Sequence, residues 1–248
     1  MGNLTPVMQT IFWFLVVFIV TMIAGLTLMV YRGIAETKRR TSQDREDYYN
    51  QMWIKEPGNP EWPLQLGLWN SHQMQLCSGE QRKEAAEKAF RYFQSWLSLR
   101  DDIEPTNDYS PMKYLAISAF EAGALEEARI YAQRLLKFAD HNPQRSVGNS
   151  IHYGNLILGR LALRSGYVET AKAYLIEAGK TPGSPQLNSF GPRLALAKEL
   201  LEIGERDVVL QYFALCARFW RCSWGNLQRW TKEVNQGKIP DFPGNLMM

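Results

Sequence analysis

The feature that most constrains this chain is a pair of short helices that recurs along it. Four small residues mark the second helix of each pair, the first three at intervals of 43 residues and the last after a further 38: Ala85, Ala128, Ala171 and Val209. Around each of them, apolar residues recur at the spacing of one helical face. A glycine lies shortly before each segment: Gly79, Gly123, Gly166 and Gly204. Glycine suits a tight turn between antiparallel helices, so the pattern predicts stacked helix pairs that share one core.

The helix before each turn carries a second signature, a leucine followed by a small residue. This signature occurs in three units: Leu115–Ala116, Leu158–Gly159 and Leu196–Ala197. The first unit fits worst, with only Trp69 in its upstream helix. These positions follow the pattern W-x2-L-G-x2-Y, so residues from about Glu61 to Trp220 resemble the tetratricopeptide-repeat family. The resemblance implies an all-α solenoid of about four hairpins with a concave binding surface.

The period of the repeat departs from that family, whose units are about 34 residues long. The surplus lies in long loops between the units, such as RDDIEPTNDYSP and DHNPQRSVGNS. HEAT-like helix pairs, with periods of about 40–47 residues, are therefore the second candidate architecture. An irregular helical bundle without a true repeat is the third. All three alternatives are all-α.

An apolar segment, IFWFLVVFIVTMIAGLTLMVY, spans residues 11–31 and contains no charged residue. A helix needs about 20 such residues to cross a hydrocarbon core roughly 30 Å thick. A cleaved secretory signal would have basic residues before the apolar run and a small-residue cleavage site after it, and neither is present. A buried helix of a soluble protein would usually show a polar face. We therefore predict a transmembrane anchor in residues 1–32.

The charged residues around this segment predict its orientation. Five basic residues follow the apolar run and none precedes it: Arg32, Lys38, Arg39, Arg40 and Arg45. The positive-inside rule then places the repeat domain on the cytoplasmic side of a bacterial inner membrane or an equivalent membrane, with the N-terminus outside. The alternative is a translocated repeat domain.

Composition changes divide the rest of the chain into three parts. Residues 33–60 are strongly charged and end in the helix-breaking sequence EPGNP, which predicts a juxtamembrane stalk and linker. Residues 61–222 contain the repeats. Residues 223–248 contain Leu227, Trp230 and Val234 on one helical face, which predicts a capping helix that closes the last repeat, or alternatively a patch that binds a partner.

Motifs that carry chemistry are absent from the sequence. There is no HExxH, Walker or GxSxG motif, and the three histidines lie far apart. Cys216 and Cys222 match no common zinc spacing, and the first of them lies on an inward helical stripe. The net charge of only +3 predicts no nucleic-acid partner. We therefore expect no enzyme activity, cofactor or metal, unless a site is assembled across several repeats.

The resemblance to tetratricopeptide repeats implies that each first helix lines the groove at fixed offsets. Eight residues at these offsets form the candidate groove: Lys113, Ile117, Phe120, Tyr153, Leu156, Arg160, Arg164 and Lys198. Together they would give a mildly basic, partly apolar surface suited to an acidic peptide or protein edge. The alternative is that these cations are ordinary solvated residues.

The leading functional hypothesis is a membrane-anchored scaffold or docking subunit that binds protein partners in a membrane-associated complex. The second hypothesis is a chaperone or assembly factor that holds client peptides in the groove. An enzyme with a site not visible in the sequence is the remote third hypothesis.

Overall fold

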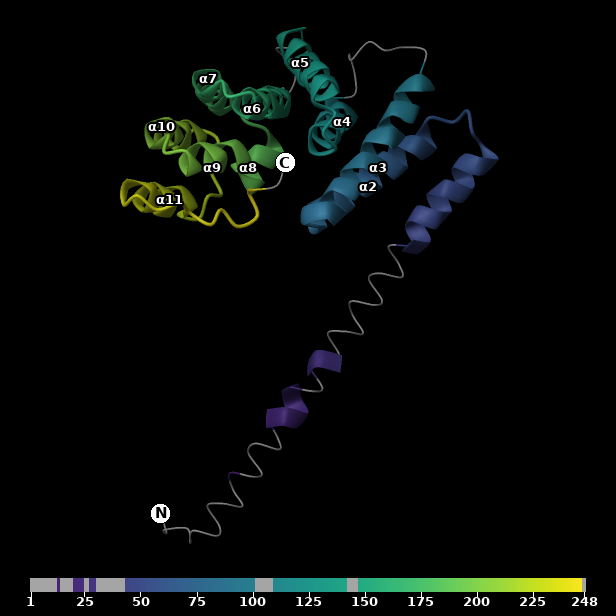
Figure 1. Ribbon diagram of the computed structural model, residues 1–248, viewed down its shortest axis with the longest axis horizontal. Coiled ribbons are helices and arrows are strands. Elements are labelled where there is room, and N and C mark those ends of the chain that lie inside the picture. Colours follow the sequence, from purple (N-terminus) through teal and green to yellow (C-terminus); the bar gives the residue numbers. More distant parts are fainter. Residues whose placement is uncertain are drawn as a thin grey trace. The chain divides into compact units, whose positions relative to one another are not determined.

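The computed structural model describes residues 43–100, 109–141 and 147–246, together with Trp13 and residues 20–24 and 27–29. The chain divides into two compact units, Met1–Lys55 and Glu56–Met248 (Figure 1). In the first unit the described residues are helical and include a helix over residues 43–55. The described residues of both units contain helices and no strand, which confirms the predicted all-α class.

Only a minor part of the predicted transmembrane segment is described. Trp13, residues 20–24 and residues 27–29 are helical and exposed, and the Thr27 hydroxyl donates a hydrogen bond to the carbonyl of Ile23 at 2.7 Å. Within the part of the chain that the structure describes, no helix combines the length and the apolar character needed to cross a membrane. Most of residues 11–31 lie outside the described residues, so the anchor stays a prediction.

The second unit consists of helices joined by short turns and a few longer loops. Their bounds are α2 (Glu61–Leu76), α3 (Gly79–Ser98), α4 (Tyr109–Glu121), α5 (Leu125–His141), α6 (Gly148–Arg164), α7 (Val168–Gly179), α8 (Pro185–Phe190), α9 (Ala195–Glu202), α10 (Arg206–Cys216) and α11 (Asn226–Asn235). Four hairpins result, namely α2–α3, α4–α5, α6–α7 and α9–α10, as the sequence predicted. The short helix α8 was not predicted.

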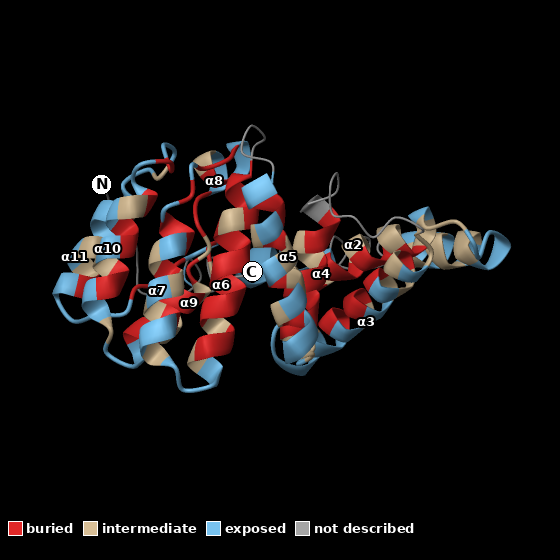
Figure 2. Cartoon of the chain, turned by 90° about the horizontal axis from the view of Figure 1, so that it is seen from above, coloured by how far each residue is buried: buried red, intermediate tan, exposed pale blue. Residues whose placement is uncertain are grey.

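The hairpins stack in sequence order. The first helices α2, α4, α6 and α9 contact one another in that order, while α3, α5 and α7 each contact the first helix of the next hairpin. One continuous hydrophobic core runs from Met74 in α2 to Phe242 near the C-terminus, and buried residues lie on the facing sides of the helices (Figure 2). This arrangement is that of a helical solenoid, because each hairpin completes its core against its neighbours.

The turns inside three hairpins share one hydrogen-bond pattern. At the end of α4, the N–H of Ala124 donates to the carbonyl of Ala119 at 2.9 Å, and the N–H of Gly123 donates to that of Phe120 at 3.2 Å. The same pair of bonds recurs after α6 and α9, at Gly166 and Gly204. These are Schellman caps, which need a residue with positive φ, and the three glycines have φ between 80° and 92°. The turns predicted at Gly123, Gly166 and Gly204 are therefore confirmed.

The predicted small residues in the first helices also lie where helices approach closely. Ala116 and Ala197 are fully buried. A Cβ added to Gly159 in α6 would lie 2.4 Å from Leu196 Cδ2 in α9 and 3.1 Å from Tyr174 Cβ in α7. Any larger residue at position 159 would separate three helices. The first hairpin uses a different register, since a Cβ added to Gly67 in α2 would lie 2.8 Å from the Phe93 ring in α3.

The C-terminal segment closes the last hairpin. Leu227, Trp230 and Val234 of α11 are buried, at 5%, 1% and 1% exposure, and the Trp230 ring contacts the rings of Trp220 and Phe242. Past α11 the chain returns to the start of α9. There Asn245 donates through its amide to the carbonyls of Phe190 and Pro192, and accepts from the N–H of Leu194. The predicted capping helix is thus observed, and the returning tail adds a second closure that the sequence did not indicate.

Candidate protein-docking face

The predicted groove residues lie on three consecutive first helices, but the structure divides them by burial. Ile117, Phe120 and Leu156 belong to the hydrophobic core, with at most 2% exposure, and Tyr153 belongs to it with 8% exposure. A partner cannot contact these apolar side chains without a rearrangement of the helices. The polar edge of α4, α6 and α9, together with Arg193 immediately before α9, therefore forms the accessible surface, called here the docking face.

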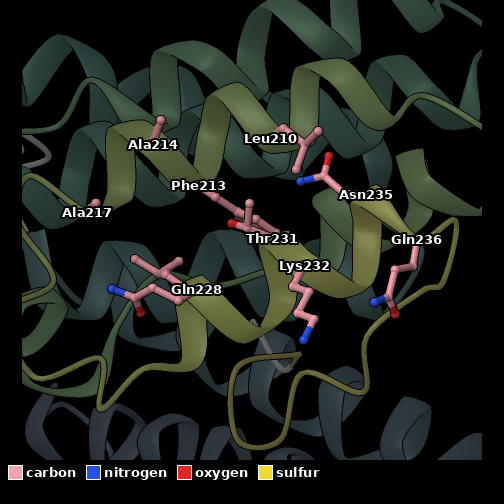
Figure 3. Close-up of a pocket in the computed structure, with 10 residues that line it drawn as sticks. Leu210, Phe213, Ala214, Ala217, Gln228, Thr231, Lys232, Asn235 and Gln236 are labelled. Atoms are coloured by element: carbon pink, nitrogen blue, oxygen red, sulfur yellow. The ribbon is translucent and has the colours of Figure 1, made fainter.

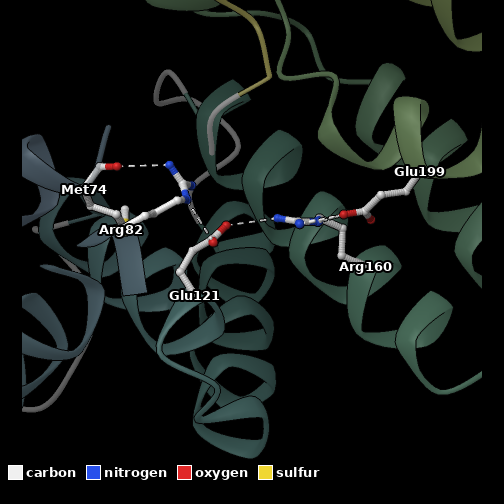
Figure 4. Close-up of polar contacts among 5 residues, drawn as sticks. All are labelled: Met74, Arg82, Glu121, Arg160 and Glu199. Carbon is white, nitrogen blue, oxygen red and sulfur yellow. Dashed lines mark hydrogen bonds and ion pairs between the residues drawn. The ribbon is translucent and has the colours of Figure 1, made fainter. Parts of the chain in front are cut away.

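A chain of ion pairs crosses the docking face between Lys113 and Arg164 (Figure 4). Arg82 contacts Glu121 at 3.1 Å, Glu121 contacts Arg160 at 3.2 Å, and Arg160 contacts Glu199 through two nitrogens, one of them at 2.8 Å. Arg82 also donates to the carbonyl of Met74 at the end of α2. This compensated cluster (Arg82, Glu121, Arg160 and Glu199) joins all four hairpins.

Glu121 is the centre of the compensated cluster. Burial raises the pKa of its carboxyl group, but the hydrogen bond from Arg82 and the charges of Arg160 and Arg82 outweigh burial, so the pKa falls below its ordinary value. The side chains of Glu121 and Arg160 are only 14% and 11% exposed. Arg160 is therefore a structural residue that holds hairpins together, and little of its charge is available to a partner.

Arg164 lies one turn beyond Arg160 on α6 and has different surroundings. Its guanidinium carbon lies 3.9 Å from the centre of the Phe120 ring, and that of Arg160 lies 4.4 Å from the same ring. The ring faces hold both cations by cation–π attraction. Arg164 itself is exposed and forms no ion pair with a carboxylate of the described residues. Its charge is accessible to solvent.

Lys113 lies at the opposite end of the docking face. Its Nζ lies 4.2 Å from the ring centre of Tyr114 and 5.0 Å from that of Tyr153. The Tyr153 hydroxyl accepts a hydrogen bond from Arg193 Nε at 3.3 Å. Lys113 and Arg193 therefore contact the same tyrosine, and neither forms an ion pair with a carboxylate of the described residues. We call Lys113, Tyr114, Tyr153 and Arg193 the basic site.

The electrostatics of the basic site are unfavourable in the absence of an anion. Burial lowers the pKa of the Lys113 ammonium, Tyr114 opposes this effect, and the charge of Arg193 lowers the pKa further. Two cations near one tyrosine ring are a suitable environment for a carboxylate or another anion.

His152 supports the basic site from within the core. Its ring is fully buried between α6 and α7, where Nδ1 lies 3.2 Å from the carbonyl of Ala178 and Nε2 accepts from the N–H of Arg193 at 3.1 Å. Burial outweighs the bond to Ala178 and lowers the pKa of His152 to about 4, so the ring is neutral. The neutral ring positions the backbone of Arg193, whose guanidinium also donates to the carbonyl of Gly244.

The remaining predicted residue, Lys198, lies apart from both clusters. Its Nζ is 4.0 Å from Glu202 one turn later, and its side chain is 38% exposed. This is an ordinary surface pair of low energetic value. Sequence reasoning missed Glu121, Glu199 and Arg193, which determine what the predicted cations do.

A groove of about 600 Å³ lies elsewhere in the unit, between α10 and α11 (Figure 3). Apolar residues of α10, such as Leu210 and Ala214, face the amide side chains of Gln228 and Asn235 from α11. Its lining residues include no carboxylate, histidine or cysteine, and Thr231 and Lys232 supply the hydroxyl and the amine on its wall.

Neither metal nor thiol chemistry is organised in the part of the chain that the structure describes. No three His, Cys, Asp or Glu side chains there converge to hold a metal ion. Cys216 is buried, and burial raises the pKa of its thiol, as expected for an inert core cysteine. Cys77 and Cys222 are free thiols, the second of them exposed.

The fold defines the class of protein as an all-α stack of helical hairpins. Neither a comparison with protein-family models nor a search among curated proteins finds a match. Membership of the tetratricopeptide-repeat family therefore stays a prediction, which depends on the repeat pattern alone.

Proposed function

We propose that this protein is a membrane-anchored docking scaffold whose repeat domain binds a protein partner on the face formed by α4, α6 and α9. The observation that carries the proposal is the distribution of charge on that face. The cations at its two ends, Lys113 with Arg193 and Arg164, have no carboxylate partner among the described residues, whereas Arg160 between them is fully paired. Cations that have no carboxylate partner on the face of a solenoid are suited to binding an acidic protein surface.

The proposed anchor is residues 11–31, with the repeat domain on the cytoplasmic side. The support is the uncharged sequence of this segment and the basic residues after it.

Membrane fractionation tests the anchor. Replacing both Val20 and Ile23 by arginine adds a cost of about 2.5–3.5 kcal/mol for each residue in the span, so the chain should move from the membrane to the soluble fraction. A Thr21→Ala variant is the matched control and should stay in the membrane. A double-arginine variant that remains in the membrane after alkaline extraction contradicts the anchor.

The exposed thiol of Cys222 tests the orientation. A membrane-impermeant maleimide should label Cys222 only after the cells are opened, whereas buried Cys216 stays unlabelled in the folded protein. Cys77, which is partly exposed, should be replaced by serine beforehand. Labelling of Cys222 in intact cells would place the repeat domain outside.

Affinity purification from mild detergent tests the docking function. The full chain should retain a partner in fixed stoichiometry, and Arg164→Glu should release it. Arg160→Glu is unsuitable for this test, because Arg160 holds the hairpins together through Glu121 and Glu199. Recovery of the chain alone, or with many partners in small and variable amounts, would favour a client-holding chaperone instead.

A further inference from the structure

Two connecting segments meet at one end of the last hairpins. Residues 180–194 lead from α7 to α9 and include α8, and residues 217–225 lead from α10 to α11. Because α9 and α10 form an antiparallel hairpin, the start of α9 and the end of α10 lie together, opposite the turn at Gly204. The N–H of Cys222 donates a hydrogen bond to the carbonyl of Asn188 at 3.3 Å, which joins the two segments.

The two segments contain four aromatic side chains, which form an inward pair and an outward pair. Phe219 and Trp220 are buried, with 4% and 5% exposure. A Cβ added to Gly191 would lie 2.4 Å from the Trp220 ring, so this ring packs closely against the other segment. Phe190 and Trp224 are 75% and 90% exposed. Since the inward pair already holds the segments to the core, packing within the chain does not explain the outward pair.

The backbone at Trp224 is unfavourable for a residue of this kind. Its φ is 49°, and it is the single non-glycine residue with positive φ in the part of the chain that the structure describes. This conformation is strained for a residue with a Cβ and costs little for glycine. Strain of this type is concentrated at functional sites, and the exposure of the ring directs attention to a ligand outside the chain.

The charged side chains of the two segments are all basic, because neither segment contains Asp or Glu. Lys180 forms an ion pair with Glu177, and Arg193 is bound to Tyr153 and to the carbonyl of Gly244. Arg218 and Arg221 are exposed, and neither forms an ion pair with a carboxylate of the described residues. We call the outward aromatic pair and these two arginines the end patch: Phe190, Arg218, Arg221 and Trp224.

The composition of the end patch is suited to a bilayer surface. Tryptophan and phenylalanine favour the boundary between headgroups and acyl chains, and arginine is attracted to anionic headgroups. A stable protein interface buries about 800 Å² on each partner around an apolar centre, whereas the end patch offers two aromatic side chains on separate loops. We propose that the end patch docks the repeat domain onto a leaflet that contains anionic phospholipid.

This inference goes beyond the binding of a protein partner. It rests on the proposed anchor in one respect, namely that a tethered domain stays close to a bilayer and therefore needs little affinity of its own to bind it. The contact itself is argued from the side chains of the repeat unit.

The test measures contact between the end patch and lipid in the full chain. With Cys77→Ser, Cys222 is the accessible thiol, since Cys216 is buried, and it is labelled with a fluorophore. The chain is placed in nanodiscs of phosphatidylcholine, with or without phosphatidylglycerol, that also contain a nitroxide-labelled lipid. We expect strong quenching with phosphatidylglycerol and weak quenching without it, because each arginine near an anionic leaflet favours the docked state about fivefold.

Two variants of the end patch and two matched controls locate the contact. Trp224→Gly should lower the ratio of docked to undocked chain about tenfold. It should not lower the melting temperature, because glycine suits the positive φ. Arg218→Gln should lower the ratio about fivefold. Tyr167→Ser and Arg206→Gln should leave it unchanged, since these exposed residues lie at the opposite ends of α7 and α10.

Several results would overturn the lipid contact. Quenching that is equal with and without phosphatidylglycerol, or that persists in a folded Trp224→Gly protein, would do so. An equal loss of quenching with Tyr167→Ser would show that the end patch is not the site. Trp224-dependent binding of a co-purified protein or of single-stranded oligouridine, without quenching by lipid, would assign the end patch to a different ligand.

The anchor and the docking function are separated from this proposal by two further readouts. If the chain does not insert into nanodiscs, the anchor fails, and the labelled chain is mixed with an excess of vesicles of the same lipids. Absence of quenching there also overturns the end patch. If no quenching occurs but a partner co-purifies in fixed stoichiometry, the docking function stands. If quenching occurs and no partner co-purifies, the docking function fails and the lipid contact stands.

Discussion

The compensated cluster and the basic site use the same kinds of residue for different purposes. In the cluster, Arg160 lies between Glu121 and Glu199, and the chain of contacts extends to Arg82 in the first hairpin. In the basic site, Lys113 and Arg193 meet at a tyrosine with no carboxylate among the described residues. A buried cation that is paired stabilises the stack, whereas one left with another cation opposes folding unless a ligand supplies the anion.

The largest expected effect comes from removing the central cation of the compensated cluster. Arg160→Met leaves Glu121 and Glu199 near each other with one cation fewer, and breaking a largely buried pair in this way costs about 3 kcal/mol or more. We therefore expect the free energy of unfolding, measured with urea and tryptophan fluorescence, to fall by that amount.

A double variant controls for the loss of packing at Arg160. Combining Arg160→Met with Glu199→Gln removes the carboxylate left without a cation, while Glu121 keeps its contact with Arg82, so part of the lost stability should return. Lys198→Met, on the same face, should change the free energy of unfolding by less than about 0.5 kcal/mol. An Arg160→Met protein as stable as the Lys198→Met protein would show that the cluster contributes nothing to the stack.

The next effect concerns the histidine that positions Arg193. The pKa of His152 is about 4 in the folded protein and about 6.5 when unfolded, so the unfolded chain binds a proton more readily between these values. The contribution of His152 to stability is complete above pH 6.5 and is lost as the pH falls through 4, amounting to about 3 kcal/mol.

The measurement is the free energy of unfolding at several pH values between 4 and 7. His152→Gln retains a donor and an acceptor without titrating, so the part of the pH dependence that belongs to His152 should disappear in this variant. His141→Gln is the matched control, because His141 is exposed. A wild-type protein whose stability does not decrease below pH 6.5 relative to His152→Gln would contradict the burial of a neutral ring.

The local features of the fold were largely predictable from the sequence. The spacing of Gly123, Gly166 and Gly204 predicted the turns correctly, because a Schellman cap depends on local backbone geometry that a glycine reveals. Gly159, the small residue of the Leu158–Gly159 pair, lies where α6 approaches α7 and α9 closely. The first hairpin was misaligned, since its small residue is Gly67 rather than one at the register of the other units. No feature of the sequence near Gly67 indicates this shift in register.

The site was predicted less well than the fold. Family offsets selected Lys113, Arg160 and Arg164 as equivalent cations, yet among these three only Arg160 forms ion pairs with carboxylates of the described residues. The partners Glu121 and Glu199 each lie 39 residues from Arg160, and such contacts between hairpins cannot be inferred from one helix at a time. Arg193 was not selected from the sequence, because its position depends on His152 and on the returning tail.

At the basic site we expect a smaller change in the free energy of unfolding, and of the opposite sign to that of Arg160→Met. Lys113→Met removes a charge that burial and Arg193 disfavour and retains an apolar side chain of similar length. The free energy of unfolding should therefore rise by about 1 kcal/mol, because the desolvation of the ammonium no longer opposes folding. The opposite signs of Lys113→Met and Arg160→Met in the same assay are the sharpest test of the comparison. A fall in stability at Lys113 would mean that this cation is paired as well.

The smallest effect is expected at Arg164, which belongs to neither group. Its guanidinium lies over Phe120, whose ring Arg160 also contacts, and its charge is exposed. An exposed cation–π contact contributes about 0.5–1 kcal/mol, and Arg164→Gln also relieves the repulsion between two neighbouring arginines, so the free energy of unfolding should change by less than about 0.5 kcal/mol.

Urea unfolding of the full chain measures this change, with Arg160→Met as the reference. A large loss of stability would make Arg164 a structural residue like Arg160. An unchanged stability, together with the loss of a bound partner, assigns the Arg164 cation to binding, which neither its sequence position nor its exposure establishes alone.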